Sequence, residues 1–329
     1  MIYLESGDVR SDFNLALEQY VFDRLPRNES YFMLWQNSPS VIVGKYQNTL
    51  EEVNAEYVRA HQIHVTRRLS GGGAVYHDLG NINFTYVMDD RAQGAADWSF
   101  FCSPLIETLA HIGIKAELSG RNDVLIDGKK FSGNAQYRRE GRVMHHGTIL
   151  FHSDMSVLGN ALRPSKAKIE SKGVKSVKSR VTNVWDHLKK PMELEEFWEL
   201  LRENMAYRQG AVKKELTDAE TEAVKQIQRE RYSTWEWNWG NSPACTIRKE
   251  GRIEGCGNIQ VFLSVQNGCI EDCAFYGDFF GEGATEKLKQ ALSGCPLDGA
   301  KLKERLTGME ISRCFYNMTQ KDLIGLIMQ

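Results

Sequence analysis

The sequence lacks any hydrophobic run long enough to cross a membrane. Its longest uninterrupted apolar stretch in 329 residues is Tyr31–Trp35, whereas a transmembrane helix needs about 20 apolar residues. Residues 1–8 also lack the basic region and apolar core of a signal peptide. We therefore expect a cytoplasmic protein with no membrane partner.

The sequence also has little net charge and no paired metal-binding cysteines. Its 41 basic and 43 acidic side chains give a net charge of −2, so the balance does not favour nucleic acid as a partner. Cys269 and Cys273 have three residues between them, which is not the spacing of a zinc knuckle, and no histidine follows His187. An odd number of cysteines, seven, without a secretion signal indicates reduced thiols.

The order of the predicted elements indicates an α+β fold with two domains. Strands gather in runs, over about residues 114–151 and 244–276, instead of alternating with helices as in a doubly wound sheet. The chain is longer than the roughly 250–300 residues that one core usually supports. We therefore predict a large domain with a mixed or antiparallel sheet at residues 1–240 and a small α+β domain at residues 241–329.

Local patterns predict where several elements begin and end. Apolar residues at helical spacing predict a helix over about residues 13–25, with Asp12 as its N-cap. The pattern Thr217-x-x-Glu220 is a capping box before a later helix, and Asp127-Gly128 is typical of a tight turn between strands. Residues 249–251 are interpreted as a turn in the small domain.

The most informative stretch is Arg67–Asp78, which contains three consecutive glycines, Gly71–Gly73. Such glycines suit a turn that approaches a ligand closely or needs positive φ. Consecutive backbone N–H groups in a turn of this kind bind anions, and Arg67 and Arg68 add positive charge. From these residues alone, the stretch is either a carboxylate or phosphate site or a glycine-rich hairpin with surface arginines.

Several common nucleotide and hydrolase motifs do not fit the sequence. A dinucleotide-binding G-x-G-x-x-G would need glycine where Tyr76 stands, and a hydrolase G-x-S-x-G would need glycine at Arg68. After Gly44-Lys45, Tyr46 replaces the hydroxyl residue of a P-loop, and H-E-x-x-H does not occur. Rossmann, P-loop, serine-hydrolase and zinc-protease sites are therefore excluded.

A second stretch, Gly120–Ala135, carries Asp123 and Lys130 on the two sides of the Asp127-Gly128 turn. The turn folds Lys130 back across from the strand of Asp123. A lysine that pointed inward there would need an anion, whereas an isolated lysine is usually exposed. Asp123 is interpreted either as the partner of Lys130 or as a ligand for a metal that arrives with a nucleotide.

Two further stretches are less specific. His145 and His146 begin a strand, and a histidine pair without a third ligand at matching spacing is usually hydrogen-bonded structure. The basic run Lys172–Asn183 would ordinarily be a solvated face. Glycine, serine and threonine between its lysines favour a loop that orders over an anionic ligand.

These four stretches, in this order and spacing, resemble the lipoate–protein ligase A family of the biotin/lipoate ligase superfamily. The likeness continues through Ser233–Trp237 into the small domain, so it covers essentially the whole chain. The matching segments are RRLSGGGAVYHDLGN at Arg67–Asn81, GRND at Gly120–Asp123, KFSG at Lys130–Gly133, HHGT at His145–Thr148 and KSVKSRVTN at Lys175–Asn183.

The resemblance implies an ATP-dependent ligation in two steps. Lipoate, or octanoate, attacks the α-phosphorus of ATP to give the acyl adenylate, such as lipoyl-AMP, and pyrophosphate. A lysine of a lipoyl domain then takes the acyl group, and AMP leaves. The resemblance also implies Mg²⁺ as a cofactor. The expected acceptors are the acyltransferase subunits of 2-oxoacid dehydrogenases, the H protein of glycine cleavage, or both.

The resemblance also assigns roles to individual residues. Lys130 is the expected catalytic residue, in contact with both lipoate and nucleotide, and Asp123 is the expected nucleotide contact that either holds Mg²⁺ or positions Lys130. Residues 166–183 are expected to form a loop that closes on the adenylate and excludes water. The other nucleotide-binding candidates are Arg68, Gly73, Ala74, Val75, Tyr76, Lys178, Arg180 and Asn183. The other lipoate-binding candidates are Trp35, Ser70, Gly72, Gly73, His77 and His146.

Two alternative functions stay open. An octanoyl- or lipoyl-transferase on the same scaffold would use a nucleophilic cysteine near the pocket. The only cysteine in residues 1–240 is Cys102, which lies in a predicted helix outside every motif. A non-catalytic lipoate-binding module is opposed by the presence of Arg68, Ser70 and Lys130. ATP-dependent ligation is therefore preferred.

Overall fold

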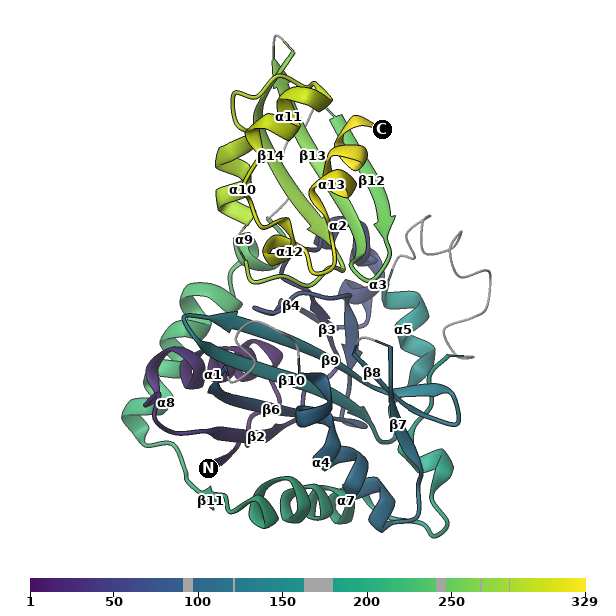
Figure 1. Ribbon diagram of the computed structural model, residues 1–329. Coiled ribbons are helices and arrows are strands. Elements are labelled where there is room, and N and C mark those ends of the chain that lie inside the picture. Colours follow the sequence, from purple (N-terminus) through teal and green to yellow (C-terminus); the bar gives the residue numbers. More distant parts are fainter. Residues whose placement is uncertain (91–96, 121, 163–179, 241–246, 267, 284) are drawn as a thin grey trace.

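A mixed sheet of eight strands forms the centre of the large lobe in the computed structural model (Figure 1). The structure describes residues 1–90, 97–120, 122–162, 180–240, 247–266, 268–283 and 285–329. Strand β1 pairs in parallel with both of its neighbours, and the other pairs are antiparallel. In spatial order the strands are β11 (Val212–Lys213), β1 (Ile2–Glu5), β2 (Tyr31–Trp35), β6 (Asn81–Asp89), β10 (Arg142–Leu150), β9 (Lys129–Arg139), β8 (Asp123–Ile126) and β7 (Ala116–Ser119).

Helices cover both faces of this sheet because its strands carry apolar residues on both sides. In β2, Phe32 and Leu34 belong to one core with α4 and α7, whereas Met33 and Trp35 belong to the other core with α1 and α8. A cavity lined by Trp35 lies on the α1 side of the sheet. The helices are α1 (Ser11–Arg24), α8 (Asp218–Ile227), α4 (Trp98–His111) and α7 (Leu194–Leu201).

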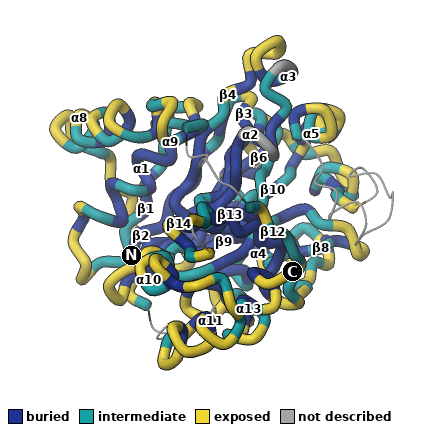
Figure 2. Tube along the Cα trace, turned by 90° about the horizontal axis from the view of Figure 1, so that it is seen from above, coloured by how far each residue is buried: buried dark blue, intermediate teal, exposed yellow. Residues whose placement is uncertain are grey.

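A second sheet of three strands places the glycine stretch beside the α1 face. Strand β3 (Ser40–Val43) lies between β4 (His64–Arg67), which is parallel to it, and β5 (Val75–His77), which is antiparallel. Figure 2 shows the strands as mostly buried, with exposed residues concentrated in surrounding helices and turns. The remaining elements of the lobe are α2 (Thr49–Glu52), α3 (Ala55–Ala60), α5 (Met155–Ala161), η2 (Val184–His187), η3 (Arg202–Ala206), η4 (Tyr207–Gln209), η5 (Gln228–Tyr232) and α9 (Trp235–Asn238).

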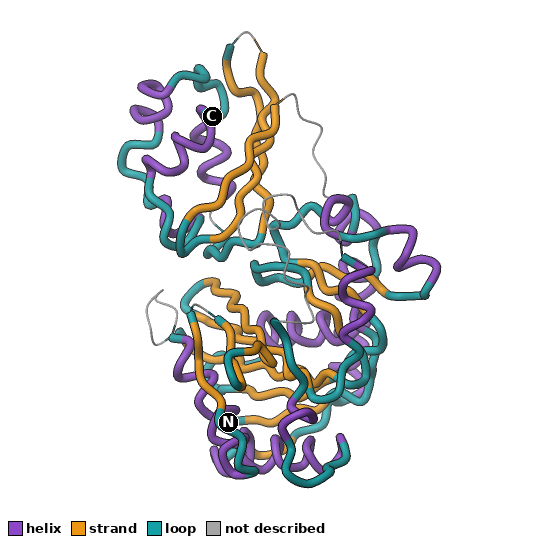
Figure 3. The backbone as a smooth tube through the Cα atoms, turned by 90° about the vertical axis from the view of Figure 1, so that its right-hand side faces the viewer, coloured by secondary structure: helices purple, strands orange, loops and turns teal. Residues whose placement is uncertain are grey.

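The small lobe is an antiparallel sheet of three strands with helices on one face (Figure 3). Its core joins Ile259, Val261 and Leu263 of the central strand to apolar residues of the helices. The elements are β12 (Ile247–Ile253), β13 (Gly257–Gln266), β14 (Cys269–Gly277), α10 (Thr285–Leu292), α11 (Gly299–Arg305), α12 (Ile311–Cys314) and α13 (Gln320–Met328). The predicted α+β class, with a large mixed sheet and a small α+β unit, is confirmed.

Two predicted element ends are wrong and two are confirmed. Helix α1 begins at Ser11 and has Arg10 at its N-cap, so Asp12 lies inside the first turn. Strand β12 runs through residues 249–251, and the chain turns later, where Gly255 has a φ of +71°. The Thr217-x-x-Glu220 capping box is present, and Asp127-Gly128 has the two positive φ values of its turn, +48° and +73°.

The domain boundary and the 166–183 loop stay predictions. The division at residue 240 falls beside residues 241–246, which lie outside the described residues, as does most of the expected 166–183 loop. Among the described residues, no helix is both long and apolar enough to span a membrane.

Candidate active site

A cavity lies between the α1 face of the large sheet and the glycine stretch. On the sheet side it is lined by Trp35 of β2, Asn83 of β6, His146 and Thr148 of β10, and Lys130 of β9. On the opposite side it is lined by Leu15, Arg68, Gly72, Gly73, Ala74, Val75 and His77. Most of the residues predicted to bind lipoate or nucleotide therefore surround one space.

The three glycines form a turn in which Gly71 and Gly72 leave little room for a side chain. Gly72 has a φ of +95°, which favours glycine. A Cβ atom on Gly44 would lie 2.0 Å from the carbonyl oxygen of Gly72, so the turn packs directly on the end of β3. The backbone N–H of Lys45 donates to the carbonyl of Ser70 at 2.9 Å. These contacts hold the backbone of the turn against the cavity.

Arg68 holds the turn from inside. Its buried guanidinium donates to Ser70 Oγ (3.0 Å) and to the carbonyls of Gly71 (2.7 Å) and Gly73 (2.9 Å). Burial lowers its pKa to about 10, so it stays charged at neutral pH. Arg67 does not add its positive charge to the cavity, contrary to the expectation for both arginines. Its donors bind main-chain carbonyls such as those of Gly44 and Trp237, and it does not line the cavity.

A chain of buried hydrogen bonds connects the cavity wall to the turn. Trp35 Nε1 donates to Thr85 Oγ1 (2.9 Å), which donates to Glu18 Oε1 (2.5 Å). His146 Nδ1 lies 2.9 Å from Glu18 Oε1, and His146 Nε2 lies 2.6 Å from Ser70 Oγ. Ser70 is therefore a link to His146 and Arg68. Glu18 was missed, because an acidic residue next to Leu17 in an amphipathic pattern gives no sign of burial.

Lys130 reaches the cavity from β9. Its Nζ lies 2.7 Å from Asp123 Oδ1 in an ion pair that is partly exposed. A Cβ atom on Gly133 would lie 2.6 Å from that Nζ, so glycine at this position makes room for the ammonium. The Lys130 N–H donates to the carbonyl of Arg180 (2.9 Å), and Thr182 N–H donates to the carbonyl of Lys130 (2.9 Å). The basic segment thus joins β9 at Lys130.

Five predicted nucleotide ligands do not line the cavity or lie outside the described residues, and one of them is Asp123, which meets Lys130 in the ion pair. The Tyr76 side chain packs on the opposite side of β5 from Val75 and His77, where burial raises its pKa to about 12, so only its backbone faces the turn. Asn183 Oδ1 and Nδ2 bind the backbone of Ser153 at 3.0 and 3.1 Å. Arg180 is exposed and meets Lys130 through its carbonyl, and Lys178 lies outside the described residues.

The small lobe also contributes to the cavity. Phe280 lines it and is almost fully buried, and its ring would lie 3.1 Å from a Cβ atom on Gly72. The N–H of Gly72 donates to the carbonyl of Phe279 (3.2 Å), and the Phe279 ring stacks on Tyr46 with centroids 4.6 Å apart. No motif pointed to Phe280, because apolar residues after a strand usually indicate core packing.

Two buried histidines give the fold a measurable dependence on pH. Burial lowers the pKa of His77 from 6.5 to about 3, and burial also lowers the pKa of His145 well below 6.5. As the pH falls, both histidines take up a proton in the unfolded chain at a higher pH than in the folded chain. Protonation therefore favours the unfolded chain, and the stability present above pH 6.5 is lost as the pH falls. We expect the free energy of unfolding to decrease by about 1.4 kcal/mol per pH unit for each histidine between pH 6 and 5.

Denaturant titrations at a series of pH values would measure this slope. His145→Gln should make it shallower by the contribution of one histidine, whereas His64→Asn, at an exposed position, should leave it unchanged. An equal slope in wild type and His145→Gln would contradict the assignment.

Comparison with known proteins identifies the family. Residues 11–206 match the lipoyl protein ligase A/B catalytic domain, and residues 242–327 match the bacterial lipoate protein ligase C-terminus. The chain is 41% identical over 314 residues to lipoate–protein ligase 1 of Staphylococcus aureus, covering 95% of each chain. It is 40% identical over 331 residues to lipoate-protein ligase LplJ of Bacillus subtilis, covering 99% of this chain and 100% of that protein.

Solved structures agree with this result. The fold matches that of P. falciparum LipL1 in complex with lipoate, with a TM-score of 0.83 at 24% identity, over 100% of this chain and 99% of that one. A lipoate-protein ligase A bound with ATP matches with a TM-score of 0.60 at 27% identity, over 73% of this chain and 97% of that one. The resemblance seen in the sequence is confirmed. The chain therefore belongs to the lipoate–protein ligase family, enzymes that carry out ATP-dependent protein lipoylation.

Proposed function

We propose that this chain activates lipoate as lipoyl-AMP in the cavity described above and then passes the lipoyl group to a lysine of a lipoyl domain. The observation that carries the proposal is that the Lys130 ammonium and the Gly72–Gly73 turn line the same cavity. Relatives named lipoate–protein ligase, and solved ligases bound to lipoate or to ATP, support it.

Lys130 has the central chemical role in this proposal. Its ammonium neutralises the lipoate carboxylate, and during attack it stabilises the negative charge that develops on the α-phosphoryl oxygens. The backbone from Gly73 to Tyr76 supplies N–H groups for the phosphates, and Arg68 keeps that backbone in place. In the second step, the same ammonium stabilises the oxyanion formed when the acceptor lysine attacks the acyl carbon.

Mg²⁺ fits the site as an ion carried by the nucleotide. Among the described residues, no group of three or more histidine, cysteine or acidic side chains could hold a metal on its own. Magnesium commonly binds one carboxylate together with substrate phosphates, and Asp123 beside Lys130 is a suitable carboxylate. When bound there, Mg²⁺ would supply charge neutralisation on the phosphates.

An acceptor panel tests the function directly. The chain is incubated with ATP, Mg²⁺ and lipoate against apo-acyltransferase lipoyl domains and apo-H protein, and each acceptor is weighed by mass spectrometry. We expect one lipoyl group per acceptor, dependent on ATP, and none when the acceptor lysine is replaced by arginine. Lack of modification on every acceptor would contradict the proposal.

The transferase alternative is disfavoured by the state of Cys102. This thiol is fully buried, and burial raises its pKa to about 12, which opposes thiolate formation. It does not line the cavity. Acyl transfer from a carrier protein in the absence of ATP would reverse this preference.

The domain limits 1–240 and 241–329 and the cytoplasmic location complete the proposal, and both rest on the sequence.

A further inference from the structure

Two hydrogen-bond donors in the wall of the cavity have no partner in the part of the chain that the structure describes. They are Nε2 of His77 and Nδ2 of Asn83, and both atoms are buried. His77 is 3% exposed and Asn83 is 1% exposed, and both residues line the cavity. Buried polar groups are nearly always hydrogen-bonded, so two unpaired groups at one end of a substrate pocket point to a ligand.

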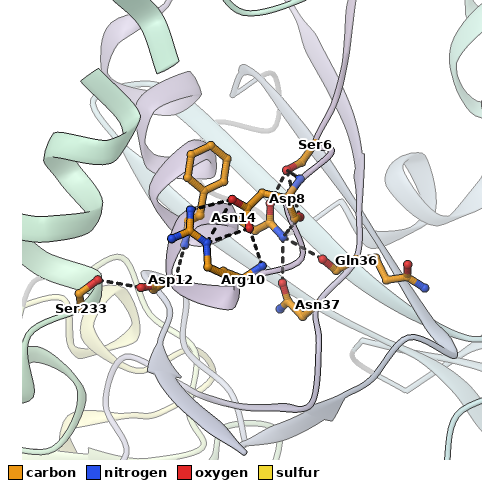
Figure 4. Close-up of polar contacts among 9 residues, drawn as sticks. Ser6, Asp8, Arg10, Asp12, Asn14, Gln36, Asn37 and Ser233 are labelled. Carbon is orange, nitrogen blue, oxygen red and sulfur yellow. Dashed lines mark hydrogen bonds and ion pairs between the residues drawn. The ribbon is translucent and has the colours of Figure 1, made fainter. Parts of the chain in front are cut away.

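The protonation of His77 follows from a chain of contacts that begins at the backbone. Asn14 Nδ2 faces the carbonyls of Asp8 (2.9 Å) and Gln36 (2.8 Å), so this atom is the amide nitrogen (Figure 4). The same nitrogen also faces Asn37 Oδ1 (3.0 Å), so the oxygen of the Asn37 amide lies on this side and its Nδ2 faces His77 Nδ1 at 3.0 Å. His77 Nδ1 therefore accepts, and the ring proton lies on Nε2.

One hydrogen bond, from Asn81, holds the amide of Asn83. Asn81 Nδ2 donates to Asn83 Oδ1 at 3.0 Å, so the carbonyl end of the Asn83 amide is occupied. Its amino end is the part without a partner. No motif pointed to Asn83, because it is a single asparagine between apolar residues of a strand pattern.

The sheet register places Asn83 away from Lys130, and His77, whose ring centroid lies 6.2 Å from that of Trp35, lies at the same end of the cavity. Trp35 pairs with Asn83, and Asn83 pairs with Thr148, so these residues form one row across β2, β6 and β10. Thr148 contacts Gly133 of β9, the strand that carries Lys130. Strands lie about 4.8 Å apart, so the row from Trp35 to β9 is about 14 Å long. An acid whose carboxylate meets Lys130 therefore extends its tail toward Trp35, His77 and Asn83.

We propose that His77 and Asn83 recognise the ring sulfurs of lipoate and so make the site prefer lipoate to octanoate. This inference rests on the proposed function. Sulfur is a weak hydrogen-bond acceptor, whereas the alkyl end of octanoate accepts nothing and leaves both donors unpaired. A site with buried donors discriminates against an analogue that cannot pair with them.

The matched pair Asn83→Val and Asn83→Thr tests the inference. The two side chains have the same shape, but only threonine keeps a hydroxyl that can accept from Asn81 and donate to sulfur. Pyrophosphate release with ATP gives kcat/KM for lipoate and for octanoate. We expect the lipoate-to-octanoate ratio to fall about three- to tenfold in Asn83→Val and to stay within about twofold of wild type in Asn83→Thr.

Controls separate this inference from the proposed function. Ile42→Val trims an apolar wall residue of the same cavity and should change kcat/KM for both acids alike. Calorimetric titration with each acid in the absence of ATP measures the ratio of the two binding affinities. His77→Phe supplies a second variant if Asn83→Val is unstable. An unchanged ratio in both Asn83→Val and His77→Phe overturns the inference. A wild-type chain that releases no pyrophosphate with either acid overturns the proposed function instead.

Discussion

Lys130→Ala should reduce lipoate-dependent pyrophosphate release on the order of 10²–10³-fold, the effect of deleting one electrostatic donor from an active site. The loss follows because Lys130 contributes the cavity's ammonium beside the glycine turn, and alanine cannot neutralise either the carboxylate or the α-phosphate. Folding should be nearly unaffected, since the Lys130–Asp123 ion pair is about one third exposed and such pairs contribute little to stability.

Lys129→Ala is the matched control for this experiment. Lys129 precedes Lys130 on the same strand but is exposed and does not line the cavity, so its loss should leave the rate within about twofold. Burst measurements of lipoyl-AMP formation locate the defect in the first step. Near-normal adenylate formation by Lys130→Ala, with the melting temperature unchanged, would remove Lys130 from its catalytic role.

The sequence predicts those parts of the site that depend on local backbone geometry. Three consecutive glycines predict a turn with positive φ, which Gly72 has. The Asp127-Gly128 turn pairs adjacent strands and so brings Lys130 back toward Asp123. Both features arise within about fifteen residues, where turn chemistry decides the structure. The approximate order of helices and strands follows from periodicity for the same reason.

Contacts between distant segments account for what the sequence does not predict. Phe280 meets Gly72 from more than 200 residues away, and Glu18 meets His146 across two elements that share no pattern. Residue type alone also does not identify a cavity residue. Arg67 and Arg68 are adjacent and identical, but they bind different parts of the fold. Only their positions on a finished sheet show that one of them lines the cavity.

Glu18→Ala should destabilise the protein by about 2–4 kcal/mol, because it leaves buried groups on Thr85 and His146 without their partner. The same change should slow lipoyl-AMP formation on the order of tenfold or more, since His146 then no longer fixes Ser70 and the turn behind it.

The variants Glu18→Gln and Gln19→Ala separate this effect from a general weakening of α1. Glutamine keeps one oxygen for Thr85 but brings an amide N–H₂ toward the other contact with His146, so we expect an intermediate loss of stability. Gln19 is partly exposed on the same helix, and its replacement should cost at most about 1 kcal/mol. Urea titrations give the stabilities. A Glu18→Ala chain as stable as Gln19→Ala would mean that the hydrogen bonds from Trp35 to Ser70 do not act as one unit. Position 18 would then be a tolerated acidic residue in the core, and His146 would not contribute to holding the glycine turn.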